Sequence, residues 1–180
     1  MPDIQIRKFE VKDRDAVRRI SCETAFLEEE RSFFIDDDEV LADALTLYYT
    51  DYEAESCFVA AAHDQVIGYI IGTKNAAGME RIFSKQILPK LLIKAFKRGF
   101  FLKSKTWLLF FNVIKSALKG EFYALHFSAE YPAMLHINID KDYRSRQVGK
   151  RLINCYLEFI KSQGIAGVHF GTVSEGARFS

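Results

Sequence analysis

The chain has 180 residues, and its 25 Lys and Arg residues nearly balance its 24 Asp and Glu residues. With 49% hydrophobic and 27% charged residues it can bury a sizeable core, which excludes disordered, collagen-like and coiled-coil proteins. We expect one domain over residues 1–180, and the near-neutral charge disfavours a nucleic-acid partner. The charge is unevenly distributed, because residues 81–120 carry ten cations and no acid and leave the rest of the chain strongly acidic.

The cysteines and the apolar segments predict an intracellular, metal-free protein. Cys22, Cys57 and Cys155 are widely spaced and form no metal-binding pattern, so we expect free buried thiols in a reducing cytoplasm and no bound metal. No signal peptide is expected at the start of the chain. The most apolar run, 107–114, is far shorter than the roughly 20 residues of a membrane span.

The first quarter of the chain predicts a strand and two helices. Alternating apolar residues favour a strand over 4–9, and apolar residues at helical spacing favour an amphipathic helix over 12–27. A second helix is predicted from Asp37. Its apolar side is expected to face the core, with Asp43 and Thr46 on the opposite side.

Two further groups of elements follow. The β-rich runs 57–62 and 66–72 predict a hairpin. Later, an apolar strand over 133–139, a polar loop, a helix from Val148 and a strand over 168–173 form a strand-helix-strand unit. The two strands of such a unit are expected to be parallel.

Between these groups we predict a basic helical insertion over 77–127. Its first helix is expected to bury Leu92 and Phe96 with other apolar residues, while Lys94 and Arg98 occupy the opposite, cationic face. A second helix is predicted over 107–118. The basic segment 81–120 has three interpretations: a lid over a substrate site, a peripheral surface for anionic lipid, or cations that balance the acidic remainder of the fold.

The polar loop between the strand 133–139 and the helix from Val148 is suited to bind an anion. N–H groups at a helix start have no acceptor within the helix, and the helix dipole adds positive potential there. Gly149 is expected to let a phosphate approach the backbone, and Arg144, Arg146, Lys150 and Arg151 add positive charge. An arginine-rich, solvated helix start is the alternative.

Here the sequence resembles the GNAT superfamily of acyl-CoA-dependent N-acyltransferases. The segment Arg144-Ser145-Arg146-Gln147-Val148-Gly149 matches the first and last positions of the family's (Arg/Gln)-x-x-Gly-x-(Gly/Ala) loop, with Gln147 at the first glycine. A glutamine with negative φ is compatible with binding. A weaker resemblance, through residues 131–137, is to acetyltransferase-like proteins related to the C-terminal domain of O-GlcNAc hydrolases. The resemblance implies an α/β (α+β) fold with a mixed central sheet flanked by helices.

The resemblance also implies how acetyl-CoA would bind. The main chain of Ile137 and Ile139 would pair with the pantetheine arm, which enters where the last strand splays away. Ser174 stands at the asparagine of the family's Asn-x-x-Ala motif. The pyrophosphate would bind the segment formed by Arg144, Ser145, Arg146, Gln147, Val148, Gly149 and Lys150.

Candidates for catalysis come from the residues around the cofactor strand. His136 and Asn138 project opposite Ile137, where they would line an acceptor site or be satisfied within the fold. Glu130 is a candidate base or a solvated loop carboxylate, and the same alternatives hold for Glu53 and Glu55.

The predicted function is an acetyl-CoA-dependent N-acetyltransferase that transfers acetyl to a primary amine of a small molecule or peptide, by direct attack in a ternary complex. The alternative is a non-catalytic acyl-CoA-binding or partner-binding module. This alternative arises because the sequence ends before the family's acid tyrosine and closing strands. Three interpretations follow: the chain is truncated, a partner completes the sheet, or catalysis is impaired. The sheet edge after Val173 would favour a homodimer.

Overall fold

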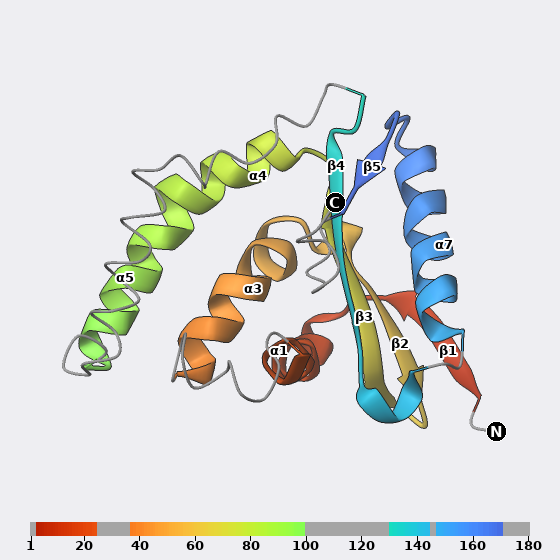
Figure 1. The fold of residues 1–180 in the computed structure, drawn as a ribbon, viewed down its shortest axis with the longest axis horizontal. Coiled ribbons are helices and arrows are strands. Elements are labelled where there is room, and N and C mark those ends of the chain that lie inside the picture. The colour runs from red at the N-terminus through yellow and green to blue at the C-terminus, as the bar shows by residue number, and fades with distance from the viewer. Residues whose placement is uncertain (1–2, 25–36, 100–129, 145–146, 171–180) are drawn as a thin grey trace, which may run out of the picture.

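The computed structural model describes residues 3–24, 37–99, 130–144 and 147–170. Within these ranges a five-stranded sheet has the order β1-β2-β3-β4-β5 (Figure 1). The first three pairings are antiparallel and the β4–β5 pairing is parallel, so the sheet is mixed, as expected. The strands are β1 (Ile4–Lys8), β2 (Phe58–Ala62), β3 (Gln65–Thr73), β4 (Ala133–Ile139) and β5 (Val168–His169).

Helices cover both faces of the sheet. Helices α1 (Arg14–Thr24) and α3 (Asp38–Tyr52) lie on one face, and α7 (Val148–Ser162) lies on the other (Figure 1). Successive strand residues point to opposite faces. Tyr69 therefore packs in the α1–α3 core, and its neighbour Ile70 packs in the α7 core with Tyr156.

The β2–β3 connection is the predicted hairpin. His63 and Asp64 both have positive φ, 49° and 63°, as the two central residues of a tight turn that matches strand twist require. The register shifts between Ala60 and Ala61, which leaves Ile67 as the extra residue on β3.

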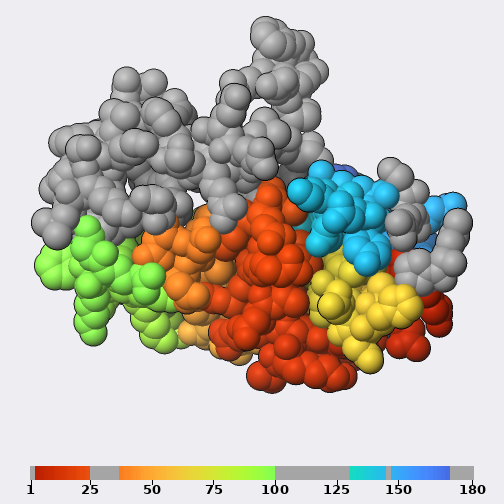
Figure 2. Space-filling model, turned by 90° about the horizontal axis from the view of Figure 1, so that it is seen from below, coloured from red at the N-terminus to blue at the C-terminus, as the bar shows by residue number. Residues whose placement is uncertain are grey.

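The described part of the insertion is helical and packs on α3. It contains α4 (Ala76–Ile82), a π-helical turn (Phe83–Ile87) and α5 (Leu88–Lys97), which ends before Gly99 at φ 70°. Figure 2 shows the insertion in green, α3 in orange and α1 in red in a row along one side of the molecule. The helix predicted over 107–118 lies outside the described residues.

The orientation predicted for α5 is wrong. Leu91 and Ala95 are buried, but the side chains of Leu92 and Phe96 are 51% and 71% exposed. Lys94 and Arg98 instead face α3, where they contact its acidic residues. The helix is therefore rotated toward its ion pairs, and one apolar stripe faces outward.

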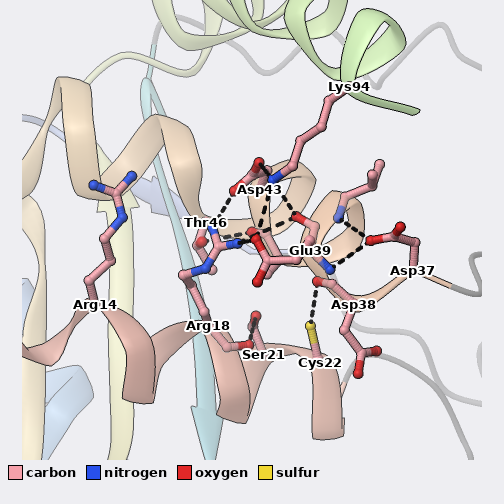
Figure 3. Close-up of polar contacts among 12 residues, drawn as sticks. Arg14, Arg18, Ser21, Cys22, Asp37, Asp38, Glu39, Asp43, Thr46 and Lys94 are labelled. Carbon is pink, nitrogen blue, oxygen red and sulfur yellow. Dashed lines mark hydrogen bonds and ion pairs between the residues drawn. The ribbon is translucent and has the colours of Figure 1, made fainter. Parts of the chain in front are cut away.

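Asp43 is the centre of this contact (Figure 3). Its carboxylate pairs with Arg18 of α1 and with Lys94 of α5, whose Nζ lies 2.6 Å from Oδ2. Glu39 contacts the same two cations, at 2.9 and 3.3 Å. Burial acts to raise the pKa of Asp43, but the hydrogen bonds from Lys94 and Arg18 outweigh it and hold that pKa below its usual value.

These contacts correct the prediction that Asp43 and Thr46 lie on a solvent side of α3, since both are buried. The contacts also support the interpretation that the cations of the basic segment balance the acidic remainder of the fold, because Lys94 and Arg98 pair with acidic residues there. Arg98 pairs with Asp37, which also caps the N-terminus of α3 by accepting from Glu39 N and Val40 N.

Candidate active site

Strand β4 presents backbone groups toward β5 at alternate residues. Asp140 N donates to Ile67 O beside β3, and Ala133 N donates to Gly167 O beside β5. Because backbone groups of a strand alternate between its two neighbours, the N–H and C=O groups of Ile137 and Ile139 point to the β5 side.

The strands β4 and β5 pair over a short distance only. Ala133 pairs with Val168 and Met134 pairs with His169, and no other described residue pairs with β4 on this side. Of the predicted strand 168–173, residues 168 and 169 form β5, Phe170 does not, and residues 171–173 lie outside the described residues. Beyond Met134, no described strand pairs with the backbone of β4 on this side, which suits Ile137 to an extended ligand, whereas Ile139 O accepts from Arg144 Nε.

The loop after β4 is held by its own side chains. The Asp140 carboxylate accepts from Asp142 N at 3.1 Å and stabilises a single helical turn, Lys141–Tyr143. Arg144 Nε donates to Ile139 O at 3.2 Å, so this cation lies at the end of the β4 edge. Tyr143 packs against the α7 core.

The N-terminus of α7 follows directly. The first backbone hydrogen bond of the helix runs from Arg151 N to Gln147 O, and Gln147 makes no capping bond with its side chain. The N–H groups of Val148, Gly149 and Lys150 precede that bond and lack acceptors within the helix. Together with the helix dipole they form a site suited to an anion such as pyrophosphate.

The backbone at Gln147 differs from the expectation of negative φ. Its φ is 59° and its ψ is 10°, in the left-handed region that favours glycine. The site therefore keeps the backbone turn for which the family motif has glycine, although the residue is glutamine.

Gly149 and Arg151 also have contacts outside the loop. A Cβ on Gly149 would lie 3.2 Å from Ile139 Cδ1, so the absence of a side chain here lets α7 pack closely on β4. Its predicted role in phosphate binding is a separate matter. Arg151 donates from NH2 to Ile4 O at 2.7 Å and is thus held at β1. Ser145, Arg146 and Ser174 lie outside the described residues.

Solved structures resemble the chain over almost its whole length. The crystal structure of SsHAT matches with a TM-score of 0.72 and 25% sequence identity, covering 98% of this chain and 86% of that one. The polyamine N-acetyltransferase of Drosophila melanogaster, which catalyses formation of N-acetylagmatine, matches with a TM-score of 0.56 and 18% identity, covering 98% and 79%. Ard1 from Thermoplasma volcanium gives 0.51 and 19%, covering 98% and 78%. No family model and no curated protein matches.

The chain has the GNAT fold. The β4 edge, the loop and the N-terminus of α7 occupy consecutive positions in this fold, and the sequence predicted all three.

On the other face of β4 in this GNAT fold, His136 and Asn138 point toward the α1 side of the sheet. Asn138 Nδ2 lies 2.9 Å from His136 Nε2 and 2.8 Å from the Tyr69 hydroxyl. Desolvation by the surrounding protein lowers the pKa of His136, although its side chain keeps contact with solvent. This shift favours the uncharged form of the ring.

The three candidate glutamates have different surroundings. Glu130 is exposed and precedes β4. It is separated along the strand from His136, which lies three residues after the start of β4, or about 10 Å at about 3.3 Å per residue. Glu55 is exposed and pairs with Lys74 at 2.8 Å.

Glu53 is buried, which corrects its interpretation as a solvated carboxylate. Its oxygens accept from Tyr48, Ser56 and Thr73 hydroxyls and from Lys74 N, at 2.7 to 3.0 Å. These bonds join the end of α3 to the end of β3, so the carboxylate has a structural role.

The described residues contain no group of His, Cys, Asp or Glu side chains that could hold a metal ion. Cys22 and Cys57 are buried and Cys155 is half-buried, and all three are free thiols. Among the helices of the described ranges, none is long and apolar enough to cross a membrane.

Proposed function

We propose that this protein is an acetyl-CoA-dependent N-acetyltransferase that acts on a primary amine. The observation that supports this most is the continuity of the β4 edge with the N-terminus of α7, which the Gln147 side chain does not cap. The backbone of Ile137 and the N–H of Ile139 suit an extended, amide-containing arm. The N–H groups of Val148, Gly149 and Lys150 suit a pyrophosphate. Coenzyme A carries both groups in this order.

In the proposed ternary complex, the amine nitrogen attacks the thioester carbon directly. The C–N bond forms, the C–S bond breaks, the amine loses a proton to a base, and the departing thiolate takes up a proton. Glu130, His136 and Asn138 remain the predicted contributors. Of these, His136 and Asn138 lie in the middle of β4, directly beside Ile137 and Ile139.

Acetyl-CoA binding tests the proposal, with Lys150→Glu as the variant. Lys150 is exposed in the first turn of α7, so a carboxylate there repels the pyrophosphate. Lys161→Glu makes the same charge change in the last turn of the same helix and is the matched control. By calorimetry we expect binding to weaken at least tenfold in Lys150→Glu and to stay unchanged in Lys161→Glu. Wild-type protein that does not bind acetyl-CoA would overturn the proposal.

The alternative, a non-catalytic acyl-CoA-binding or partner-binding module, predicts the same binding without transfer. Wild-type protein incubated with acetyl-CoA and a panel of small-molecule and peptide amines separates the two. Release of free CoA thiol that depends on the amine supports the enzyme. Binding without amine-dependent release supports the module.

A second binding role, for the basic segment 81–120, is supported by the outward face of α5. Leu92, Ile93 and Phe96 are 51%, 57% and 71% exposed, and Lys90 and Lys97 border them. Apolar side chains bordered by lysines are typical of helices that lie on anionic lipid. We expect the protein to sediment with phosphatidylglycerol vesicles and not with phosphatidylcholine vesicles, and to lose this binding in Phe96→Asp. Sedimentation with neither vesicle would remove this role.

A further inference from the structure

Arg151 connects the first turn of α7 to the edge strand β1. Its backbone N–H donates to Gln147 O at 3.1 Å, which is the first backbone hydrogen bond of the helix. Its side chain extends to β1, where Nη2 donates to Ile4 O at 2.7 Å. One residue therefore both closes this turn and attaches it to a strand that lies 147 residues away in the sequence.

The Ile4 carbonyl points away from the neighbouring strand. Among the described strands, β1 pairs with β2 only. Phe9 N, directly after β1, donates to Cys57 O on the β2 side. Because backbone groups of a strand alternate in direction, those of the odd-numbered residues face β2 and the Ile4 carbonyl points to the open edge. The guanidinium of Arg151 thus satisfies a carbonyl of an edge strand.

The same turn is also held against β4. Val148 is buried in the α7 core, and Gly149 packs closely on Ile139. The turn that carries the N–H groups of Val148, Gly149 and Lys150 is therefore fixed by packing on β4 and by the Arg151 hydrogen bond at β1. A helix N-terminus binds an anion through the direction of these N–H groups, so the contacts that fix the turn also fix the site.

We propose that Arg151 is a positioning residue of the anion site, which orients the first turn of α7 through the Ile4 carbonyl and does not bind the anion itself. Lys150, the adjacent cation, is exposed in the same turn and acts on the anion through its charge. The inference rests on the proposed function for the identity of the anion as the pyrophosphate of acetyl-CoA. It assigns different roles to two neighbouring cations that the sequence treats alike.

The first test uses the protein without acetyl-CoA. Arg151→Met keeps an unbranched side chain but removes the donor to Ile4 O, and Lys150→Met makes the same replacement at the adjacent residue. NMR measures deuterium exchange of the backbone N–H at position 151, corrected for the intrinsic rate of each sequence. We expect exchange to be about tenfold faster than in the wild type in Arg151→Met, because the turn opens more often, and unchanged in Lys150→Met. An unchanged rate in Arg151→Met would overturn the inference.

The second test separates positioning from direct contact with phosphate. Calorimetry measures acetyl-CoA affinity at several salt concentrations, because a cation that binds phosphate adds to the salt dependence of binding and a hydrogen bond within the protein does not. We expect Arg151→Met to weaken binding roughly three- to tenfold with the salt dependence of the wild type, and Lys150→Met to reduce both affinity and salt dependence.

Two results of the binding experiment would overturn the inference: unchanged affinity in Arg151→Met, or a salt dependence that both variants reduce equally. Wild-type protein that does not bind acetyl-CoA would instead overturn the proposed function. In that case the exchange rate of the N–H at position 151 still decides whether the Arg151 side chain holds the first turn of α7.

Discussion

Substitution of Asp43 by Asn tests whether the contact between α1, α3 and α5 holds the insertion on the fold. The variant keeps the shape of the side chain but removes its charge, so that Arg18 and Lys94 lose the more buried of the two carboxylates that they share. Glu39→Gln is the matched control, because Glu39 contacts the same two cations from the same helix.

The magnitude follows from the exposure of the side chains. Those of Asp43 and Arg18 are 11% and 13% exposed, and that of Lys94 is 32% exposed. Removing one partner of a buried pair costs about 3–5 kcal/mol, and the partial exposure of Lys94 reduces this to roughly 2–3 kcal/mol. Glu39 is 56% exposed, so its loss is expected to cost about 0.5 kcal/mol.

Urea unfolding at pH 7 measures both free energies, and the melting temperature of Asp43→Asn should fall by roughly 5–10 °C. Because the pKa of Asp43 is lowered in the folded protein, its contribution is present above the usual value near 3.8 and is lost as the pH falls through the folded pKa. The difference between wild type and variant should therefore narrow only below about pH 4. Equal destabilisation by Asp43→Asn and Glu39→Gln would refute the reasoning.

Two further substitutions test local features of the structure. Gln147→Gly should raise the free energy of unfolding by about 0.5–1 kcal/mol without weakening acetyl-CoA binding, because φ is 59° at this position and a side chain is strained there; lower stability in urea would contradict this. Glu53→Gln replaces an oxygen that accepts two hydrogen bonds with an NH₂ group and should lower the free energy of unfolding by roughly 2–3 kcal/mol. The control Glu55→Gln, at an exposed position, should change that free energy by less than about 0.5 kcal/mol. Similar losses of stability in the two variants would count against the network around Glu53.

The elements that the sequence predicted best are those defined by local pattern. The strand 133–139 was predicted with the bounds that the structure has, and the helix from Val148 and the hairpin were also confirmed. In each, alternation or helical spacing is bounded by turn residues, so the signal lies within a dozen residues. The anion-suited loop was predicted for the same reason, and its binding of an anion stays a prediction.

What the sequence did not reveal depends on contacts between distant segments. The rotation of α5 follows from Lys94 and Asp43, which are 51 residues apart, and it exposes Leu92 and Phe96, which helical periodicity alone assigns to the buried face. Glu53 was interpreted as solvated because nothing in its local sequence shows that Tyr48 and Thr73 surround it. The sequence did show acidic residues in the helix from Asp37 and cations in the insertion, which have complementary charge. It did not show which cation pairs with which acid.

The period of two along β4 explains how one strand can serve both parts of the proposed reaction. At Ile137 and Ile139 the backbone points to the β5 side and the side chain packs on α7. At His136 and Asn138 the backbone pairs with β3 and the side chain lies on the α1 side of the sheet. Cofactor-facing backbone and acceptor-facing side chains thus alternate residue by residue. A one-residue slip of β4 against β3 would exchange the two sets, so the hydrogen bond between Asn138 and Tyr69 marks the one register in which both are placed.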